Sequence, residues 1–146
     1  MKRILILIAI FTMAVAPAAM AEYVSVKVPV ANIRSGPSEK SDLLWKVEKY
    51  HPLFVLEKKG AWYHFRDFEG DEGWIHSSLV DKEQTVITKK EDCNVRSGPG
   101  TQFDILFTAE AGIPFRVLKK QGSWLNVLYS DGDRGWLHQS LVWPDQ

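Results

Sequence analysis

Short apolar segments, broken by glycine, proline, asparagine and aspartate, follow one another along the chain after residue 21. Apolar and polar residues alternate within them, so that Leu125, Val127 and Tyr129 share one parity. A period of two is typical of β-strands that bury one face. In the C-terminal half we predict five short strands, at 94–96, 113–120, 123–130 and 134–139 and, after one helical turn, near residue 142.

The whole pattern occurs twice. A shift of 62 positions aligns Val24 with Val86 and Val80 with Val142 without a gap, and 24 of the 57 pairs are identical. Copies of about 60 residues are long enough for small domains and longer than solenoid repeats. We therefore predict an all-β fold of two tandem small barrels, 22–81 and 82–146. The polar stretch 81–85 joins them and is short enough to hold them close together.

The alternation also assigns faces to the last hairpin of each copy. We take Val127 and Leu137 as core residues, which requires an odd-length loop or a bulge near Gly132. A two-residue loop at Asp131 and Gly132 would instead place Val127 opposite Trp136. The sequence leaves both registers open. With the first register, the tryptophans of this hairpin face away from the core.

The N-terminus has the order of a secretory signal peptide. Lys2 and Arg3 precede an apolar segment at 4–15, and Ala-Met-Ala at 19–21 is a cleavage site. We predict a signal peptide at 1–21 and an exported mature chain, periplasmic or secreted. No later stretch reaches the roughly 20 apolar residues of a membrane helix, so no membrane anchor is expected after cleavage.

Charge and cysteine content exclude several classes of function. The chain has 18 basic and 18 acidic residues, and loss of Lys2 and Arg3 leaves 16 − 18 = −2, so no nucleic-acid partner is expected. Cys93 is the only cysteine and aligns with Ala31, which indicates a small buried position. Pairing of Cys93 between two chains is the alternative. A thiol enzyme is the least favoured hypothesis, because its first copy would lack the nucleophile.

Both copies carry Asn-[Ile/Val]-Arg-Ser-Gly-Pro, then Gly-x-Trp, then Gly-Trp-[Ile/Leu]-His-x-Ser-Leu-Val. From about 24 to 143 this pattern resembles bacterial SH3-like (SH3b) domains. The resemblance implies five-stranded SH3-like barrels that bind rather than catalyse, often on cell-wall peptidoglycan or wall-processing enzymes. His76 and His138 stand where proline-binding SH3 domains have proline, so a proline-rich ligand is not expected.

The candidate ligand site is an aromatic shelf in each domain, because indole faces suit stacking on sugar rings or peptide stems. The alternatives are tryptophans that close the barrel and a histidine that bonds to the neighbouring turn. The shelf residues are Trp62, Trp74, His76, Trp124, Trp136 and His138.

The repeated hexapeptide is interpreted as a structural turn, with anion binding by its arginine as the alternative. One matching histidine per domain is too few for a metal, and no cofactor is expected. The turn residues are Asn32, Arg34, Gly36, Pro37, Asn94, Arg96, Gly98 and Pro99.

These observations predict an exported, non-catalytic protein that binds peptidoglycan or its peptide stems through two sites. The alternative is a periplasmic adaptor that binds an envelope protein such as a cell-wall hydrolase. Wall binding predicts two similar exposed shelves, whereas protein binding predicts that one is buried or altered. Tyr63 and Phe65, placed beside the first shelf, are more aromatic than Leu125 and Val127 and indicate that the copies differ.

Overall fold

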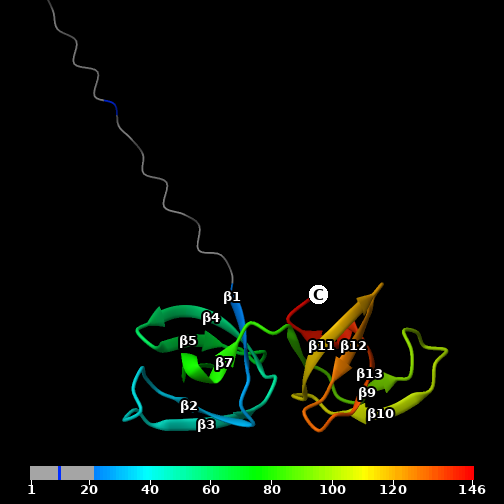
Figure 1. Ribbon diagram of the computed structural model, residues 1–146, viewed down its shortest axis with the longest axis horizontal. Coiled ribbons are helices and arrows are strands. Elements are labelled where there is room, and N and C mark those ends of the chain that lie inside the picture. The colour runs from blue at the N-terminus through cyan, green and yellow to red at the C-terminus, as the bar shows by residue number, and fades with distance from the viewer. Residues whose placement is uncertain (1–9, 11–21) are drawn as a thin grey trace, which may run out of the picture.

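The computed structural model describes Ile10 and residues 22–146, so the predicted signal peptide lies, apart from Ile10, outside the described residues. Two antiparallel β-sheets, one for each sequence copy, lie side by side (Figure 1). The described part of the chain contains no α-helix, and the predicted all-β fold with two tandem domains is confirmed. No helix among these residues is long and apolar enough to cross a membrane.

The first sheet contains seven strands and one turn of 3-10 helix. They are β1 (Glu22–Val26), β2 (Val30–Arg34), β3 (Leu43–Glu48), β4 (Pro52–Lys59), β5 (Trp62–Arg66), β6 (Glu72–His76), η1 (Ser77–Leu79) and β7 (Val80–Asp81). The strand order is β3-β2-β6-β5-β4-β1-β7.

The second sheet repeats this arrangement. Its elements are β8 (Thr85–Thr88), β9 (Cys93–Arg96), β10 (Ile105–Ala109), β11 (Pro114–Gln121), β12 (Trp124–Leu128), β13 (Arg134–His138), η2 (Gln139–Leu141) and β14 (Val142–Trp143). The strand order β10-β9-β13-β12-β11-β8-β14 matches that of the first sheet position by position.

The prediction of five strands per domain missed two in each sheet. In the second domain these are β8 and β10, and neither has a clean alternating pattern. All four residues of β8 are buried, whereas β10 is an edge strand whose first four residues are exposed or half-buried. A strand buried on both faces, or exposed on both, has no period of two for the sequence to reveal.

The last hairpin has the odd-length loop that the core assignment required. Val127 lies opposite Gly135 and Leu125 opposite Leu137, so the register with a two-residue loop is wrong. Three residues, 130–132, form the loop: Tyr129 N–H donates to Asp133 O (2.8 Å) and Gly132 N–H to Tyr129 O (3.0 Å). Gly132 closes the loop at φ +100°, a conformation that favours glycine. Val127 and Leu137 are fully buried, as predicted.

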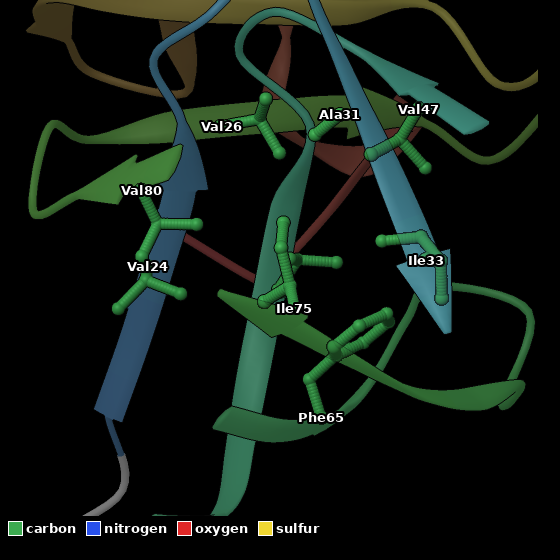
Figure 2. Packing of buried hydrophobic residues seen from close by; sticks show 9 residues of the cluster. Val24, Val26, Ala31, Ile33, Val47, Phe65, Ile75 and Val80 are labelled. Carbon is green, nitrogen blue, oxygen red and sulfur yellow. The ribbon is translucent and has the colours of Figure 1, made fainter. Parts of the chain in front are cut away.

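Each domain has its own apolar core. In the first domain, side chains from strands all around the sheet converge on one cluster, as Figure 2 shows for Val26, Ile33, Phe65 and Ile75. Its buried members are Val24, Val26, Ala31, Ile33, Val47, Leu53, Phe65, Ile75 and Val80. The second core has Val86, Cys93, Val95, Ala109, Phe115, Leu125, Val127, Leu137 and Val142.

The two domains are packed together, as the short joint predicted. Ile87 of β8 is fully buried yet lies outside the core of its own domain, and β8 contacts β4 of the first domain. Tyr23 of β1 meets Trp143 of β14 edge-on, with ring centroids 5.6 Å apart. Tyr129 Oη donates to Glu48 Oε2 across the boundary (3.4 Å).

Candidate functional site

The outer face of the last hairpin brings one tryptophan and one histidine together in each domain. Trp62 lies opposite His76 on β5 and β6, and their rings meet edge-on at 5.2 Å and 87°. Trp124 and His138 repeat this at 5.1 Å and 83°. We call these two contacts the Trp–His pairs. All four side chains are half-buried, so the pairs belong to the surface and not to either core.

Each histidine is held by the 3-10 turn that follows it. His76 Nδ1 accepts the Ser78 backbone N–H (3.1 Å) and lies 2.7 Å from Ser78 Oγ. His138 makes the same contacts with Ser140, at 3.2 and 2.7 Å. Because Nδ1 accepts, the hydrogen of the neutral ring is on Nε2, which is then the donor toward a ligand or water. Each pair therefore offers an apolar indole face beside a positioned N–H.

A hollow of about 400 Å³ adjoins the first pair. It is lined by Val30, Asn32, Arg34, Glu39, Trp62, His76 and Leu79. The strand with the repeated hexapeptide therefore lies beside the Trp–His pair. Sequence reasoning did not identify Val30, Glu39 and Leu79 as lining residues, because their proximity depends on how β2, the turn that follows it and η1 meet in space.

The repeated arginines brace the turns that carry them. Arg34 Nη1 donates to Ser41 O (3.1 Å), and Arg96 Nη1 donates to Thr101 O and Phe103 O (both 3.0 Å). In each arginine these bonds use only Nη1 of the guanidinium.

The backbone of the turn closes next to the arginine. Ser35 N–H donates to Asp42 O (2.9 Å), and Ser97 N–H to Asp104 O (2.8 Å). A Cβ on Gly36 would lie 2.9 Å from Ser41 Oγ, and one on Gly98 would lie against the Phe103 ring. Pro37 and Pro99 directly follow these glycines. Asn32 and Asn94 precede the turns on β2 and β9.

Trp74 and Trp136 lie diagonally from the Trp–His pairs and differ in surroundings. His64 stacks on Trp74, with centroids 4.9 Å apart and an interplanar angle of 16°. In the second domain Asn126 takes the place of His64, and Lys119 Nζ lies 6.0 Å from the Trp136 ring centroid. The aromatic shelf of each domain thus has two parts. The Trp–His pair has the same geometry in both domains, whereas the second tryptophan, Trp74 or Trp136, has different neighbours.

The expectation that Tyr63 and Phe65 adjoin the first shelf is wrong. Phe65 is fully buried in the core, and Tyr63 packs against that core from the same side of β5. Their parity on the strand is opposite to that of Trp62 and His64, so they face inward.

The thiol is enclosed. Cys93 is fully buried, its Sγ lies 3.0 Å from Lys90 O, and burial raises the pKa of the thiol. The prediction of a small buried residue is confirmed. In the described part of the chain, no group of three or more His, Cys, Asp or Glu side chains is arranged to hold a metal ion.

The two small β domains share one strand order and one arrangement of tryptophan and histidine on the outer face. The family model for the bacterial SH3 domain matches residues 27–82 and again 89–144. The chain therefore belongs to the family of bacterial SH3 domains, of which it carries two tandem copies.

Curated relatives are longer than this chain. The chain is 29% identical over 156 residues to the putative N-acetylmuramoyl-L-alanine amidase YrvJ of Bacillus subtilis, covering 95% of this chain and 30% of that protein. It is 28% identical over 71 residues to the probable cell wall amidase LytH of Staphylococcus epidermidis, covering 46% and 24%. The chain thus spans less than a third of the length of each.

Solved structures match more distantly. An NlpC/P60 family protein from Bacillus cereus is 15% identical with a TM-score of 0.40, over 83% of this chain and 55% of that one. NlpC2 from Trichomonas vaginalis is 12% identical with a TM-score of 0.38, over 84% and 48%.

Proposed function

We propose that this is an exported, non-catalytic protein that binds peptidoglycan or its peptide stems through the two Trp–His pairs. The observation that carries the proposal is the repeated geometry of the Trp–His pairs. The ring centroids are 5.2 Å apart at an interplanar angle of 87° in the first domain, and 5.1 Å apart at 83° in the second. An indole face with an adjacent N–H donor suits a sugar ring or peptide unit that offers one apolar face and one acceptor.

Two further observations support this function. The chain belongs to the family of bacterial SH3 domains. Its relatives include a putative N-acetylmuramoyl-L-alanine amidase and a probable cell wall amidase. Two equivalent sites on one packed body also suit a polymer with repeating units, because a second contact raises avidity without a new kind of interaction. The proposal that the protein is exported is based on the signal peptide predicted at residues 1–21.

Co-sedimentation of the mature protein with purified, protein-free peptidoglycan tests the proposal. We expect wild type in the pellet and the Trp62→Ala/Trp124→Ala variant in the supernatant, with affinity reduced by about tenfold or more. The Leu56→Ala/Leu118→Ala variant is the matched control, because it removes exposed apolar side chains from equivalent positions of both domains away from the pairs. Circular dichroism establishes that each variant is folded.

Wild type remaining in the supernatant would contradict wall binding. It would favour the second candidate, an adaptor for an envelope protein such as a wall hydrolase. One observation favours that alternative: His64 covers Trp74, whereas Asn126 leaves Trp136 without a stacked ring. A pull-down of envelope proteins on the immobilised mature chain then distinguishes the two functions.

A further inference from the structure

The charges around the second tryptophan are reversed between the two domains. Glu57 of the first domain is replaced by Lys119 in the second, and Glu72 by Arg134. These residues are exposed on the outer face of equivalent strands. The reversal affects both positions and leaves the intervening tryptophan unchanged.

In the first domain both carboxylates lie beside one histidine. His64 lies over Trp74, with Nε2 3.3 Å from Glu72 Oε1 and Nδ1 3.9 Å from Glu57 Oε2. One face of the indole is therefore occupied by a side chain of the same domain, with a carboxylate near each ring nitrogen of that side chain.

In the second domain the corresponding charges are not neutralised. Among the described residues, neither Lys119 nor Arg134 forms an ion pair. Lys119 Nζ lies 6.0 Å from the Trp136 centroid. Arg134 precedes Trp136 by two residues on β13 and shares its face.

Two more cations lie on the outer face of the same sheet. Arg96 lies opposite Trp136 on β9, and Arg116 on β11 is in the row that contains Arg134. Arg116 Nε is 3.2 Å from Glu83 Oε2, an ion pair without hydrogen-bond geometry. We call the surface formed by Arg96, Arg116, Lys119, Arg134 and Trp136 the basic face.

The basic face spans four adjacent strands, β9, β13, β12 and β11. Neighbouring strands are about 4.8 Å apart, so the three intervals from β9 to β11 make the face about 14 Å wide. A single small anion reaches one or two of these cations, whereas a chain with repeated anionic groups reaches several. Arginine and lysine both bind phosphate oxygens, and an indole stacks on the apolar face of a sugar or polyol unit.

We propose that the basic face binds a linear phosphodiester polymer of polyol or sugar units. This site differs from the Trp–His pairs, and the inference does not depend on peptidoglycan binding. Charge complementarity selects the polyanion, and the covered, carboxylate-flanked Trp74 excludes it from the equivalent surface of the first domain.

The test uses synthetic glycerol-phosphate oligomers, with neutral polyglycerol of equal length beside them, in isothermal titration calorimetry. Wild type is expected to bind the phosphate oligomer and not the neutral one. Affinity should fall as salt is raised, because exposed charges are screened within about 10 Å at 0.1 M ionic strength. Lys119→Glu/Arg134→Glu is expected to weaken binding by about tenfold or more.

The matched variant is Glu57→Lys/Glu72→Arg, which is expected to bind at least as tightly as wild type. Every substitution installs the residue that the other domain carries at the same position. Both variants are therefore expected to keep the fold, which circular dichroism checks. Equal affinity of wild type and Lys119→Glu/Arg134→Glu would overturn the proposal. So would the absence of binding by wild type at low salt, or tighter binding of a single-stranded oligonucleotide than of the glycerol-phosphate oligomer.

Discussion

At the scale of single residues, a buried histidine in the first domain replaces an apolar residue of the second. His51 is only 7% exposed and stands where the second domain has Ile113. Burial lowers the pKa of His51 below its ordinary value of 6.5, against its Nδ1–H bond to Pro52 O (3.2 Å) and the Asp67 carboxylate, which act to raise it. The folded domain therefore favours the neutral form of this histidine, which packs against the Phe68 ring.

This burial predicts acid sensitivity in the first domain. Because the folded-state pKa of His51 is lowered, its contribution to stability is complete above pH 6.5 and is lost as pH falls through the folded pKa. The Tm of His51→Ile, which copies Ile113, should fall less than that of wild type between about pH 7.5 and about pH 5. The other titrating groups are common to both proteins. An equal fall in both would show that another group is responsible.

At the scale of elements, the hairpin of β12 and β13 decides which side chains become surface. Its three-residue loop places Val127 opposite Gly135 and sends Trp124 and Trp136 outward. β9 crosses so closely that a Cβ on Gly135 would lie 2.6 Å from Val95 Cγ1 and 2.9 Å from Arg96 O. The glycine before each outward tryptophan is required for strand packing, and not for the ligand.

Gly135→Ala should therefore destabilise the second domain by about 1–3 kcal/mol, because β9 or β13 must shift to admit the methyl group. Urea denaturation measures the free energy of unfolding. Ser123→Ala, which installs the alanine that the first domain has at position 61, is the control and should stay within about 0.5 kcal/mol of wild type. A Gly135→Ala protein as stable as wild type would mean that the strands are not in this close contact.

At the scale of the whole molecule, the two domains form one packed body. Ile87 is fully buried on β8, the strand that contacts β4, and the first domain has Ser25 at the equivalent position. The pairs Tyr23–Trp143 and Tyr129–Glu48 cross the boundary. As long as the domains stay packed in this way, the two proposed Trp–His sites gain avidity only on a ligand whose repeat matches their separation.

Ile87→Ser should uncouple the domains, because it removes a buried apolar side chain and buries a hydroxyl. The free energy of unfolding is expected to fall by about 2–5 kcal/mol. Differential scanning calorimetry should then show two separate transitions in place of a single one. The milder Ile87→Val should cost about 1 kcal/mol and keep one transition. If Ile87→Ser unfolds in one transition at the wild-type temperature, the interface does not couple the domains.

The sequence by itself determined the duplication and the β-structure, and it favoured the inward positions of Val127 and Leu137 and a buried thiol, which the structure confirms. These follow from local rules: a period of two, turn residues at regular intervals and repeated identities that need no knowledge of long-range contacts. It missed β8 and β10, because neither alternates, and it left the loop register open, because both loop lengths suit the same turn residues.

Only the tertiary structure decided which aromatic side chains meet. The register paired Trp62 with His76 and gave Trp74 a different partner, and the approach of β2 brought Arg34 and Glu39 to the same hollow. The reversed charges at Lys119 and Arg134 were present in the sequence, but they form one surface only because β11 and β13 flank β12 in the sheet. Contacts between strands distant in sequence depend on how the sheet is assembled, which no local pattern encodes.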